Sequence, residues 1–359
     1  MQLINGAIQN YAWGDRNAIA NLLGVAPNGQ PQAELWFGTN PGAPSHLADG
    51  RTLESVAGKL PYLVKILAAA EPLSLQVHPS SQQALEGYER ENAAGIALDA
   101  PQRTYRDPFH KPELLCALTH FEAVCGIAPL DRTDTLLSEL GPAAADMRSM
   151  LRDTGVGGVI AHVLNNRPPL AALLDAAAQH DDPRCRWLNK LSQLHPGDSS
   201  AAIILLLNYV ALEPGEAIYL GAGNLHAYLG GLGVEVMANS DNVVRCGLTP
   251  KFVDALEVLR VLDTTPLHDP VAVPEVLTDG GLRYPVPTPD FRISVYEIDG
   301  SITFTAQGTE LLLCTSGETV ELNRGQCAVA LDGELVELVG TATVYRVGVG
   351  VGVGVGATR

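Results

Sequence analysis

The segment PLSLQVHPS, residues 72–80, combines a strand pattern with two polar side chains. Apolar residues alternate along it, which predicts a β-strand, and side chains two positions apart lie on the same face of a strand. Gln76 and His78 are therefore expected to point the same way. Ser80 opens a Ser-x-x-Gln capping box with Gln83, which predicts that a helix begins there. The polar pair fits either two hydrogen-bonded groups on a half-exposed strand or a metal or active site.

The composition is that of an acidic globular protein with room for two or three domains. The chain has 359 residues, 46% of them hydrophobic, and a formal net charge of −17. This charge disfavours nucleic acid or an anionic membrane as a partner, so no nucleic acid and no membrane is expected. An anionic substrate would need a local basic cluster. The longest apolar run, residues 201–207, is too short to span a membrane.

Cysteine usage indicates a cytoplasmic protein. The six cysteines include no CxxC pair, and residues 1–10 carry no secretory signal. Reduced thiols are therefore expected. We expect a monomer or a weak homo-oligomer.

The pattern of apolar and polar residues changes along the chain and predicts a mostly β protein with an α insert. Residues 1–127 show short strands and tight turns, whereas residues 128–197 carry the Ala- and Leu-rich pattern of helices. One more helix is expected from a cap at Asp198, Ser199 or Ser200 through Tyr209, and strand patterns then resume. Residues 198–266 are assigned to the first β domain, and residues 267–346 alternate as in an all-β sandwich or barrel. We expect these segments to form a β domain split by a helical domain, followed by a second β domain. The Val-Gly repeat within 347–359 predicts a low-complexity tail, or else an extension of the last strand.

Two further polar interruptions supply the residue types of a metal site. Glu113 opens an apolar strand pattern in YRDPFHKPELLCAL, and His226 lies among small residues in GNLHAYLGG. Each alone is more often a solvated carboxylate or a hydrogen-bonded core histidine. Joined with Gln76 and His78, they provide two imidazoles, one carboxylate and one amide oxygen. Two histidines and a glutamate are a common catalytic zinc set that leaves one position open.

The segment GVEVMANSDNVVRCGLTPKFVD, residues 233–254, concentrates charged side chains between apolar flanks. Its ionisable residues before the last position are Glu235, Asp241, Arg245 and Lys251. It fits a polar loop between strands, or the wall of a pocket. In a pocket these residues could supply an acid–base group, a cation for the transition state and an anchor for an anion.

The chain resembles the type I mannose-6-phosphate isomerase (phosphomannose isomerase) family over about residues 1–265. Five segments carry the resemblance in order, namely IQNYAWG (8–14), AELWFGTNPGAPS (33–45), PYLVKILAAAEPLSLQVHPS (61–80), YRDPFHKPELLCAL (105–118) and NLHAYLGGLGVEVMANSDNVVRCGLTPK (224–251). The resemblance implies a cupin-type β-barrel (jelly-roll) catalytic domain, an inserted helical domain and a C-terminal β-barrel domain. The chain departs from the family at two positions. Cys246 stands where the family usually has Gly or Ala, and Leu225 stands where it often has proline.

The resemblance also implies roles for individual residues. One Zn²⁺ per chain would be held by Gln76, His78, Glu113 and His226. The catalytic arginine falls on Arg245, and the other catalytic positions fall on Lys111, Asp241, His110 and Glu235. Substrate-binding or pocket-edge positions fall on Lys65, Lys251, Trp13 and Glu34.

The implied reaction interconverts D-mannose 6-phosphate and D-fructose 6-phosphate through a cis-enediol, without a redox cofactor. His110 or Lys111, acting with Asp241, are the candidates for opening the pyranose ring. The carbon-bound proton could be moved by Glu235, by Lys65 or by a zinc-bound hydroxide. Lys65 would need a lowered pKa for that role.

A phosphorylated hexose also requires an anion site on this acidic chain. The cations of the matching segments are expected to form it, namely Lys65, Lys111, Arg245 and Lys251. Two alternative functions differ in class from an isomerase. One is another metal-dependent cupin enzyme, such as an Fe(II) dioxygenase, and the other is a non-catalytic sugar-binding cupin.

Overall fold

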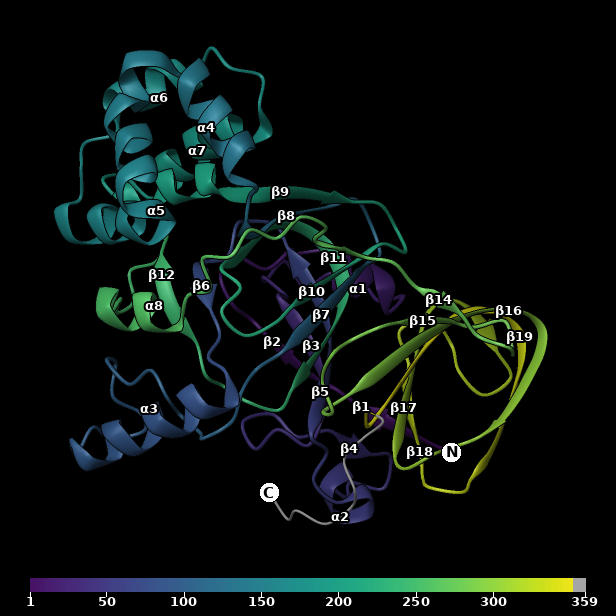
Figure 1. The fold of residues 1–359 in the computed structure, drawn as a ribbon. Helices are drawn as coiled ribbons and strands as arrows, with labels where there is room; N and C mark the ends of the chain where they lie inside the picture. Colours follow the sequence, from purple (N-terminus) through teal and green to yellow (C-terminus); the bar gives the residue numbers. More distant parts are fainter. Residues whose placement is uncertain (351–359) are drawn as a thin grey trace.

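The computed structural model describes residues 1–350, and these are mostly β, as the sequence predicts. Figure 1 shows a block of helices at one end, a large sheet in the middle and a second sheet at the other end. Among the described residues, no helix has the length and the apolar character needed to cross a membrane.

The large sheet has 11 strands. Seven follow one another in the order β13-β10-β7-β11-β5-β3-β2, while β6 and β8 also pair with β11 and are extended by β12 and β9. The strands are β2 Ala7–Gln9, β3 Glu34–Gly38, β5 Tyr62–Ala69, β6 Leu75–Val77, β7 Glu113–Ala117, β8 Phe121–Ile127, β9 Leu207–Leu212, β10 Ala217–Leu220, β11 His226–Ala238, β12 Val244–Gly247 and β13 Val271–Ala272.

Strand β5 carries one charged residue through the middle of this sheet. All eight of its residues, YLVKILAA, are buried. The register with β3 sets Lys65 opposite Trp36, and the register with β11 sets it opposite Glu235. Because opposed residues on paired strands place their side chains on the same face, the sheet brings an ammonium and a carboxylate together in its interior.

The segment of residues 72–80 folds as its pattern predicts. Strand β6 ends at Val77, and helix α3 (Ser81–Ala93) begins after Ser80. The Ser80 hydroxyl accepts a hydrogen bond from the Gln83 N–H, and the Gln83 side chain accepts one from the Ser80 N–H. The predicted capping box is therefore confirmed, and it fixes the chain directly after His78.

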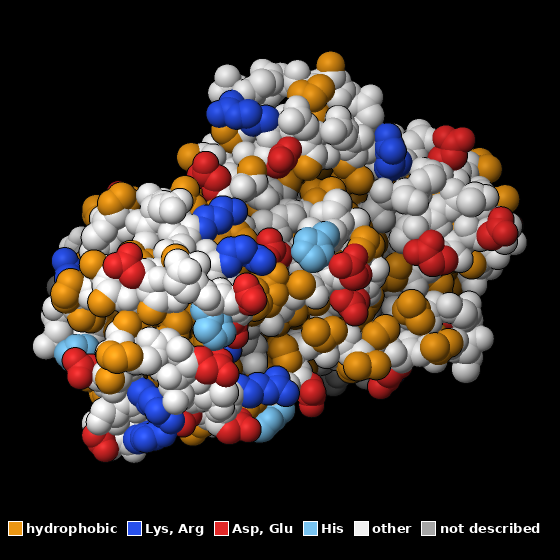
Figure 2. Space-filling view, turned by 90° about the horizontal axis from the view of Figure 1, so that it is seen from above, with side chains coloured by type: hydrophobic (Ala, Val, Ile, Leu, Met, Phe, Trp, Pro, Cys, Tyr) orange, Lys and Arg blue, Asp and Glu red, His pale blue; other side chains and the backbone are white. Residues whose placement is uncertain are grey.

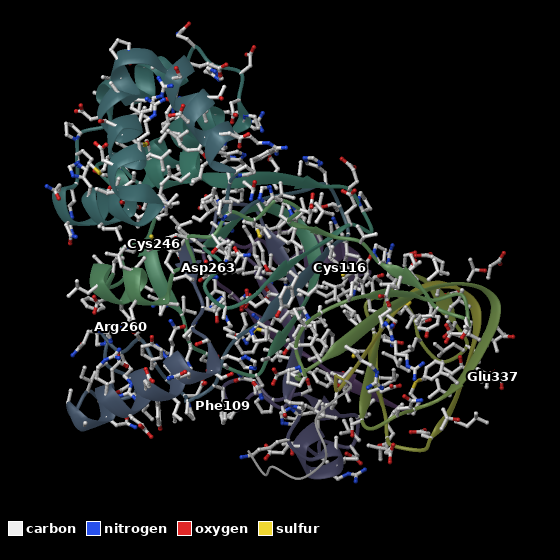
Figure 3. The ribbon with its side chains drawn as sticks, in the orientation of Figure 1. Phe109, Cys116, Cys246, Arg260, Asp263 and Glu337 are labelled. Atoms are coloured by element: carbon white, nitrogen blue, oxygen red, sulfur yellow. The ribbon has the colours of Figure 1, made fainter. Side chains whose placement is uncertain are left out.

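A helical segment lies between β8 and β9. It contains α4 Leu130–Glu139, the 3₁₀ helix η1 Gly141–Ala144, α5 Ala145–Asn166, α6 Ala171–Ala177, α7 Pro183–Leu194 and the 3₁₀ helix η2 Ser199–Leu206. Three short helices lie outside it, namely α1 Ala18–Leu22, α2 Leu53–Ala57 and α8 Ala255–Val261. The helices share an apolar core with β12 and α8, to which Leu225 and Cys246 contribute (Cys246 is labelled in Figure 3).

The second sheet has eight strands in the order β14-β15-β16-β19-β17-β18-β1-β4. Its strands are β1 Gln2–Asn5, β4 His46–Leu47, β14 Glu275–Val276, β15 Leu282–Tyr284, β16 Arg292–Thr305, β17 Glu310–Thr319, β18 Cys327–Ala330 and β19 Leu335–Gly348. The N-terminal β1 and β4 thus join the C-terminal strands, while β13 joins the large sheet. The two β regions expected from the sequence therefore share strands: β1 and β4, within residues 1–127, belong to the second sheet, and β13, within 267–346, belongs to the large sheet.

The sequence predicts that a low-complexity tail begins at residue 347, but the last strand extends past this residue. Strand β19 continues to Gly348, and Val347 is fully buried against both neighbouring strands, opposite Ile293 and Leu311. The carbonyl oxygen of Val347 also accepts a hydrogen bond of 3.2 Å from the hydroxyl of Tyr62 in the large sheet. Residues 351–359 of the expected tail lie outside the described residues.

We therefore expect a chain ending at Arg346 to be less stable than a chain ending at Gly350. The shorter chain loses the buried Val347 side chain, which is worth about 2 kcal/mol in apolar burial, together with its strand hydrogen bonds. Urea denaturation of the two chains measures the difference in free energy of unfolding. Equal unfolding midpoints would show that the end of β19 contributes nothing to stability.

Candidate metal centre and active site

A cavity of about 190 Å³ lies on the large sheet. Its walls come from β3, β5, β6, β7 and β11 and from the segment that follows β11. They include seven predicted site residues, namely Glu34, Lys65, Gln76, Lys111, Glu113, Glu235 and Asp241. A larger hollow of about 500 Å³, which Asp15, Thr315 and Arg324 help to line, contains none of the predicted residues.

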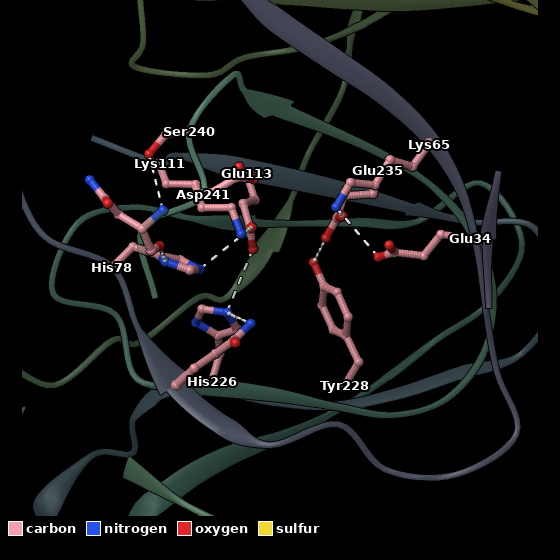
Figure 4. Close-up of polar contacts among 12 residues, drawn as sticks. Glu34, Lys65, His78, Lys111, Glu113, His226, Tyr228, Glu235, Ser240 and Asp241 are labelled. Carbon is pink, nitrogen blue, oxygen red and sulfur yellow. Dashed lines mark hydrogen bonds and ion pairs between the residues drawn. The ribbon is translucent and has the colours of Figure 1, made fainter. Parts of the chain in front are cut away.

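Three of the predicted ligands converge beside this cavity. The donor atoms of His78, Glu113 and His226 all lie within 4.8 Å of one another. The Nε2 atom of His78 is 3.5 Å from Glu113 Oε1, and the Nε2 atom of His226 is 3.6 Å from Glu113 Oε2. All three side chains are buried (Figure 4). The arrangement has the composition and spacing of a metal site.

Hydrogen bonds from the far side of each ring orient the two imidazoles. The Nδ1 atom of His78 lies 2.9 Å from the carbonyl oxygen of Asn242, and the Nδ1 atom of His226 lies 2.9 Å from that of Asn224. A carbonyl oxygen can only accept, so each Nδ1 carries the hydrogen and each Nε2 presents a lone pair to the centre. Such an outer partner is typical of metal-binding histidines.

The protonation states also suit a cation. Burial lowers the pKa of His226 to about 4, with His78 adding to the effect. Burial likewise lowers the pKa of His78, although Glu113 opposes it. Burial would raise the pKa of Glu113, but Lys111 and the two histidines lower it well below its ordinary value. Neutral imidazoles and an ionised carboxylate are the forms that bind metal.

Two polar atoms of this group have no hydrogen-bond partner. They are His78 Nε2 and Glu113 Oε2, and both are buried. A buried polar atom without a partner costs roughly 1–3 kcal/mol, and more when it is charged. A divalent cation at this point would satisfy both atoms, so the residues present fit a metal ion.

Gln76 and Lys111 complete the immediate surroundings. Gln76 pairs with His226 across β6 and β11, and its Nε2 lies 3.3 Å from His226 Nε2. Rotation of the amide by 180° exchanges its nitrogen and oxygen, so the same side chain can offer an oxygen ligand. Lys111 places its ammonium 2.9 Å from Glu113 Oε1.

A second buried polar group lies across the cavity from the histidines (Figure 4). The Lys65 ammonium is 2.9 Å from Glu235 Oε2 and 3.4 Å from Glu34 Oε1. The Tyr228 hydroxyl donates a 2.8 Å hydrogen bond to Glu235 Oε1, and the Trp36 indole donates one of 2.8 Å to Glu34 Oε2. The group therefore holds Glu235 from two sides.

The pKa shifts in this second group disfavour Lys65 as a base and favour Glu235. Burial would lower the pKa of Lys65, but Glu235, Glu34 and Glu113 together raise it above its ordinary value. Burial raises the pKa of Glu235, and the attraction of Lys65 only partly offsets this rise. The lowered pKa that a Lys65 base would require is therefore contradicted, whereas Glu235 becomes a stronger base than an exposed carboxylate.

Three neighbouring cations, none of which is among the residues that line the cavity, have no ion pair among residues 1–350. They are Arg245 and Lys251, both predicted from the sequence, and Arg106, which the sequence analysis missed. Burial lowers the pKa of Arg245, and the nearby charge of Arg106 lowers it further. Burial also lowers the pKa of Lys251, and the charges of Arg245 and Arg106 add to this shift. Elsewhere the two signs of charge are interspersed, as on the face shown in Figure 2. Lys65 and Lys111 differ from these three because carboxylates neutralise both.

Six predicted site residues are not among those that line the cavity: His78 and His226 lie beside it, Arg245 and Lys251 belong to the neighbouring cations, and His110 and Trp13 make their contacts elsewhere. His110 Nε2 lies 2.6 Å from Asp290 Oδ2, and this carboxylate is buried beyond β15 in the C-terminal part of the chain. Trp13 stacks on Tyr11 with ring centroids 5.8 Å apart, and it is Tyr11 that lines the cavity. His110 thus faces the C-terminal strands, and Trp13 supports the wall from behind.

The three aromatic residues that line the cavity were not predicted, although the sequence carried a signal for two of them. Tyr228 follows His226 by two positions on β11, and Trp36 follows Glu34 by two positions on β3. Residues two apart share a face of a strand, so both could have been found from their neighbours. Tyr11 lies outside the strands and had no such signal.

The chain is similar to proteins of known activity. Residues 1–130 match the family model described as phosphomannose isomerase type I, catalytic domain. The chain is 37% identical over 367 residues to mannose-6-phosphate isomerase of Salmonella typhimurium, with 93% of each chain covered. It is 32% identical over 377 residues to the Homo sapiens enzyme of the same name, covering 88% of this chain and 87% of the relative.

The fold is similar over almost the whole chain to a solved relative. The crystal structure of mannose 6-phosphate isomerase from Salmonella typhimurium bound to its substrate fructose 6-phosphate and a zinc atom superposes with a TM-score of 0.89. The two sequences are 34% identical, and the match covers 98% of this chain and 100% of the other. The extent of both similarities shows that the chain belongs to the type I mannose-6-phosphate isomerase family.

Proposed function

We propose that the protein interconverts D-mannose 6-phosphate and D-fructose 6-phosphate as a zinc-dependent aldose–ketose isomerase. The observation that carries the proposal is the set of groups around one cavity. A buried His–Glu–His group lies on one side, a hydrogen-bonded Glu235 on the other, and unpaired cations lie nearby. The relatives named above carry the same activity in their names, and one of them binds zinc and fructose 6-phosphate.

His78, Glu113 and His226 would hold the zinc ion, with Gln76 as the fourth ligand. Only Glu113 carries charge in this set, so the site would keep a net charge near +1. When bound, zinc supplies a Lewis acid for the sugar oxygens on C1 and C2. Lys111, paired with Glu113, adds a second positive charge at the same end of the cavity.

Glu235 is the residue best suited to move the carbon-bound proton. Its carboxylate would take the proton from C2 of the aldose while O1 gains a proton, and would return it to C1 of the cis-enediol while O2 loses its proton, which gives the ketose. Tyr228 and Lys65 hold the carboxylate in place, and burial raises its pKa toward that of an effective base. Lys65 stays protonated and serves as a positive partner. For ring opening, Lys111 with Asp241 is favoured over His110, whose Nε2 is bound to Asp290.

The phosphate would lie at the cations that have no carboxylate partner. Arg106, Arg245 and Lys251 are the candidates, because Lys65 and Lys111 already neutralise buried carboxylates. Arg245 is opposite Gln76 in the register of β12 and β6, so among the three cations it is the one whose strand position adjoins a proposed zinc ligand. We assign to it the stabilisation of negative charge that develops on the enediolate.

The finer description of the fold belongs to the same proposal. The large sheet would form a cupin-type barrel, built from residues 1–127 and 198–266 apart from β1 and β4 and joined by β13, with 128–197 as its helical insert. The C-terminal strands would form the second barrel, of which β1 and β4 are part. We propose a monomer or a weak homo-oligomer in the cytoplasm.

Glu113→Gln should abolish zinc binding while the chain stays folded, because the substitution removes the only charge among the ligands. Wild-type protein should contain about one zinc ion per chain by elemental analysis. The matched control is Glu310→Gln, which changes another buried carboxylate that pairs with Arg292 and Arg346 on the C-terminal sheet. The control should lose stability but keep its zinc. A full complement of zinc in Glu113→Gln would exclude this site.

Glu235→Gln should lower kcat by about 10²- to 10⁴-fold, the usual contribution of a general base. Its zinc content should remain that of the wild type, because Glu235 is not a ligand. Tyr228→Phe removes only the supporting hydrogen bond and should lower kcat less. Steady-state kinetics and metal analysis of the same samples measure both effects. A kcat of Glu235→Gln close to that of the wild type would show that another group moves the proton.

Arg106→Gln and Lys251→Gln should each raise KM for mannose 6-phosphate by roughly tenfold or more, since each removes a charged hydrogen bond to the phosphate. Their effect on unphosphorylated mannose should be small. The matched controls are Arg132→Gln and Lys190→Gln, which remove exposed cations from α4 and α7. Kinetics with both sugars make the comparison. An equal loss with mannose and its phosphate would place the phosphate elsewhere.

A further inference from the structure

Asn242 is fully buried, and its side chain binds the backbone of the segment that precedes β7. Its Oδ1 accepts hydrogen bonds from the N–H groups of Arg106 at 2.7 Å and Asp107 at 3.2 Å. Its Nδ2 donates to the carbonyl oxygens of Asp107 at 2.7 Å and Phe109 at 2.8 Å (Phe109 is labelled in Figure 3). One amide therefore uses its full hydrogen-bonding capacity on one short segment, residues 106–109.

The backbone of the same residue binds a zinc ligand. The carbonyl oxygen of Asn242 accepts the hydrogen bond from His78 Nδ1 at 2.9 Å. This contact sets the tautomer and the rotation of the ring, and so it aims Nε2 at Glu113. The position of the Asn242 backbone is in turn fixed by the hydrogen bonds of its side chain, which include a further one of 3.2 Å from Nδ2 to Asp107 Oδ1.

The segment held by Asn242 carries groups that the proposed function needs. Arg106 is one of the unpaired cations, and the segment runs on through His110 to Lys111. Asp107 accepts a 2.8 Å hydrogen bond from the N–H of Asp241, which lines the cavity. A shift of Asn242 would therefore move the zinc ligand His78, the cation Arg106 and the cavity residue Asp241 together.

We propose that Asn242 is a positioning residue that couples the metal centre to the phosphate-binding cations. The backbone carbonyl sets His78, and the side-chain amide sets the segment of residues 106–109. Removal of the amide takes away the hydrogen bonds that it makes to the N–H groups of Arg106 and Asp107 and to the carbonyl oxygen of Asp107, so we expect the segment and the Asn242 carbonyl both to move. The inference rests on the proposed function, since it takes zinc and a phosphorylated sugar as the two ligands.

Asn242→Ala keeps the backbone carbonyl but displaces it, and is expected to weaken zinc binding to the metal-free protein by about 10- to 100-fold, the range typical of mutations in the outer partners of metal-binding histidines. Competition with a chromophoric zinc chelator measures this affinity without substrate. The visible spectrum of the Co²⁺-loaded protein should also change, because the orientation of His78 changes. KM for mannose 6-phosphate should rise more than KM for mannose.

A matched control separates positioning from a general loss of stability. Asn208 on β9 is also buried and donates to the carbonyl oxygens of Cys125 at 3.2 Å and Leu267 at 2.9 Å. Its side chain contacts no proposed ligand and none of the three cations. Asn208→Ala should lower the unfolding temperature and leave the zinc affinity unchanged.

A second variant covers the case in which Asn242→Ala does not fold. Asn242→Asp keeps the size and the accepting oxygen but loses the two hydrogens that face Asp107 and Phe109. It should also weaken zinc binding. Wild-type zinc affinity in the folded Asn242 variants, or an equal loss in Asn208→Ala, would overturn the proposal. A wild-type protein that binds zinc but does not isomerise the sugar would instead contradict the proposed function, and the zinc comparison would still decide the role of Asn242.

Discussion

The charge of Glu113 is the constraint on which the rest of the site depends. An ionised carboxylate is stable in a buried position only when cations and hydrogen-bond donors surround it. Lys111 supplies one contact from the same strand segment, and the two histidines face the carboxylate from β11 and from the end of β6. The strand registers and the capping box after His78 hold these groups at fixed distances. Glu113 Oε2 has no hydrogen-bond partner among the described residues, so it is available to bind a metal ion.

The cations of the cavity fall into two classes, and this explains how so acidic a chain can hold an anionic sugar. Lys65 and Lys111 are buried against carboxylates, so their charge is largely neutralised by Glu235 and Glu113. Arg106, Arg245 and Lys251 form no ion pair among the described residues, so their charge is available to a ligand. The net charge of −17 therefore says little about the local field in the cavity.

Local patterns in the sequence predicted those parts of the site that lie within one strand. The two-residue period placed Gln76 and His78 near each other, and the resemblance to the isomerase family, now confirmed, indicated Glu113 and His226. Contacts between distant segments had no such signal. The bond from His110 to Asp290, the pairing of β1 with β18 and the role of Asn242 all join residues more than 130 positions apart. No pattern in the sequence indicated that Glu34 and Glu235 neutralise Lys65, because these contacts depend on the register of three strands.

The central claim is that this cavity isomerises a phosphorylated hexose with zinc and without oxygen. The most direct measurement is ³¹P NMR of zinc-loaded protein mixed with mannose 6-phosphate in oxygen-free buffer, and separately with fructose 6-phosphate. The account predicts that both samples reach the same mixture of the two sugar phosphates. Protein with a full zinc content that leaves both sugars unchanged, or that converts them only when oxygen is admitted, would contradict it.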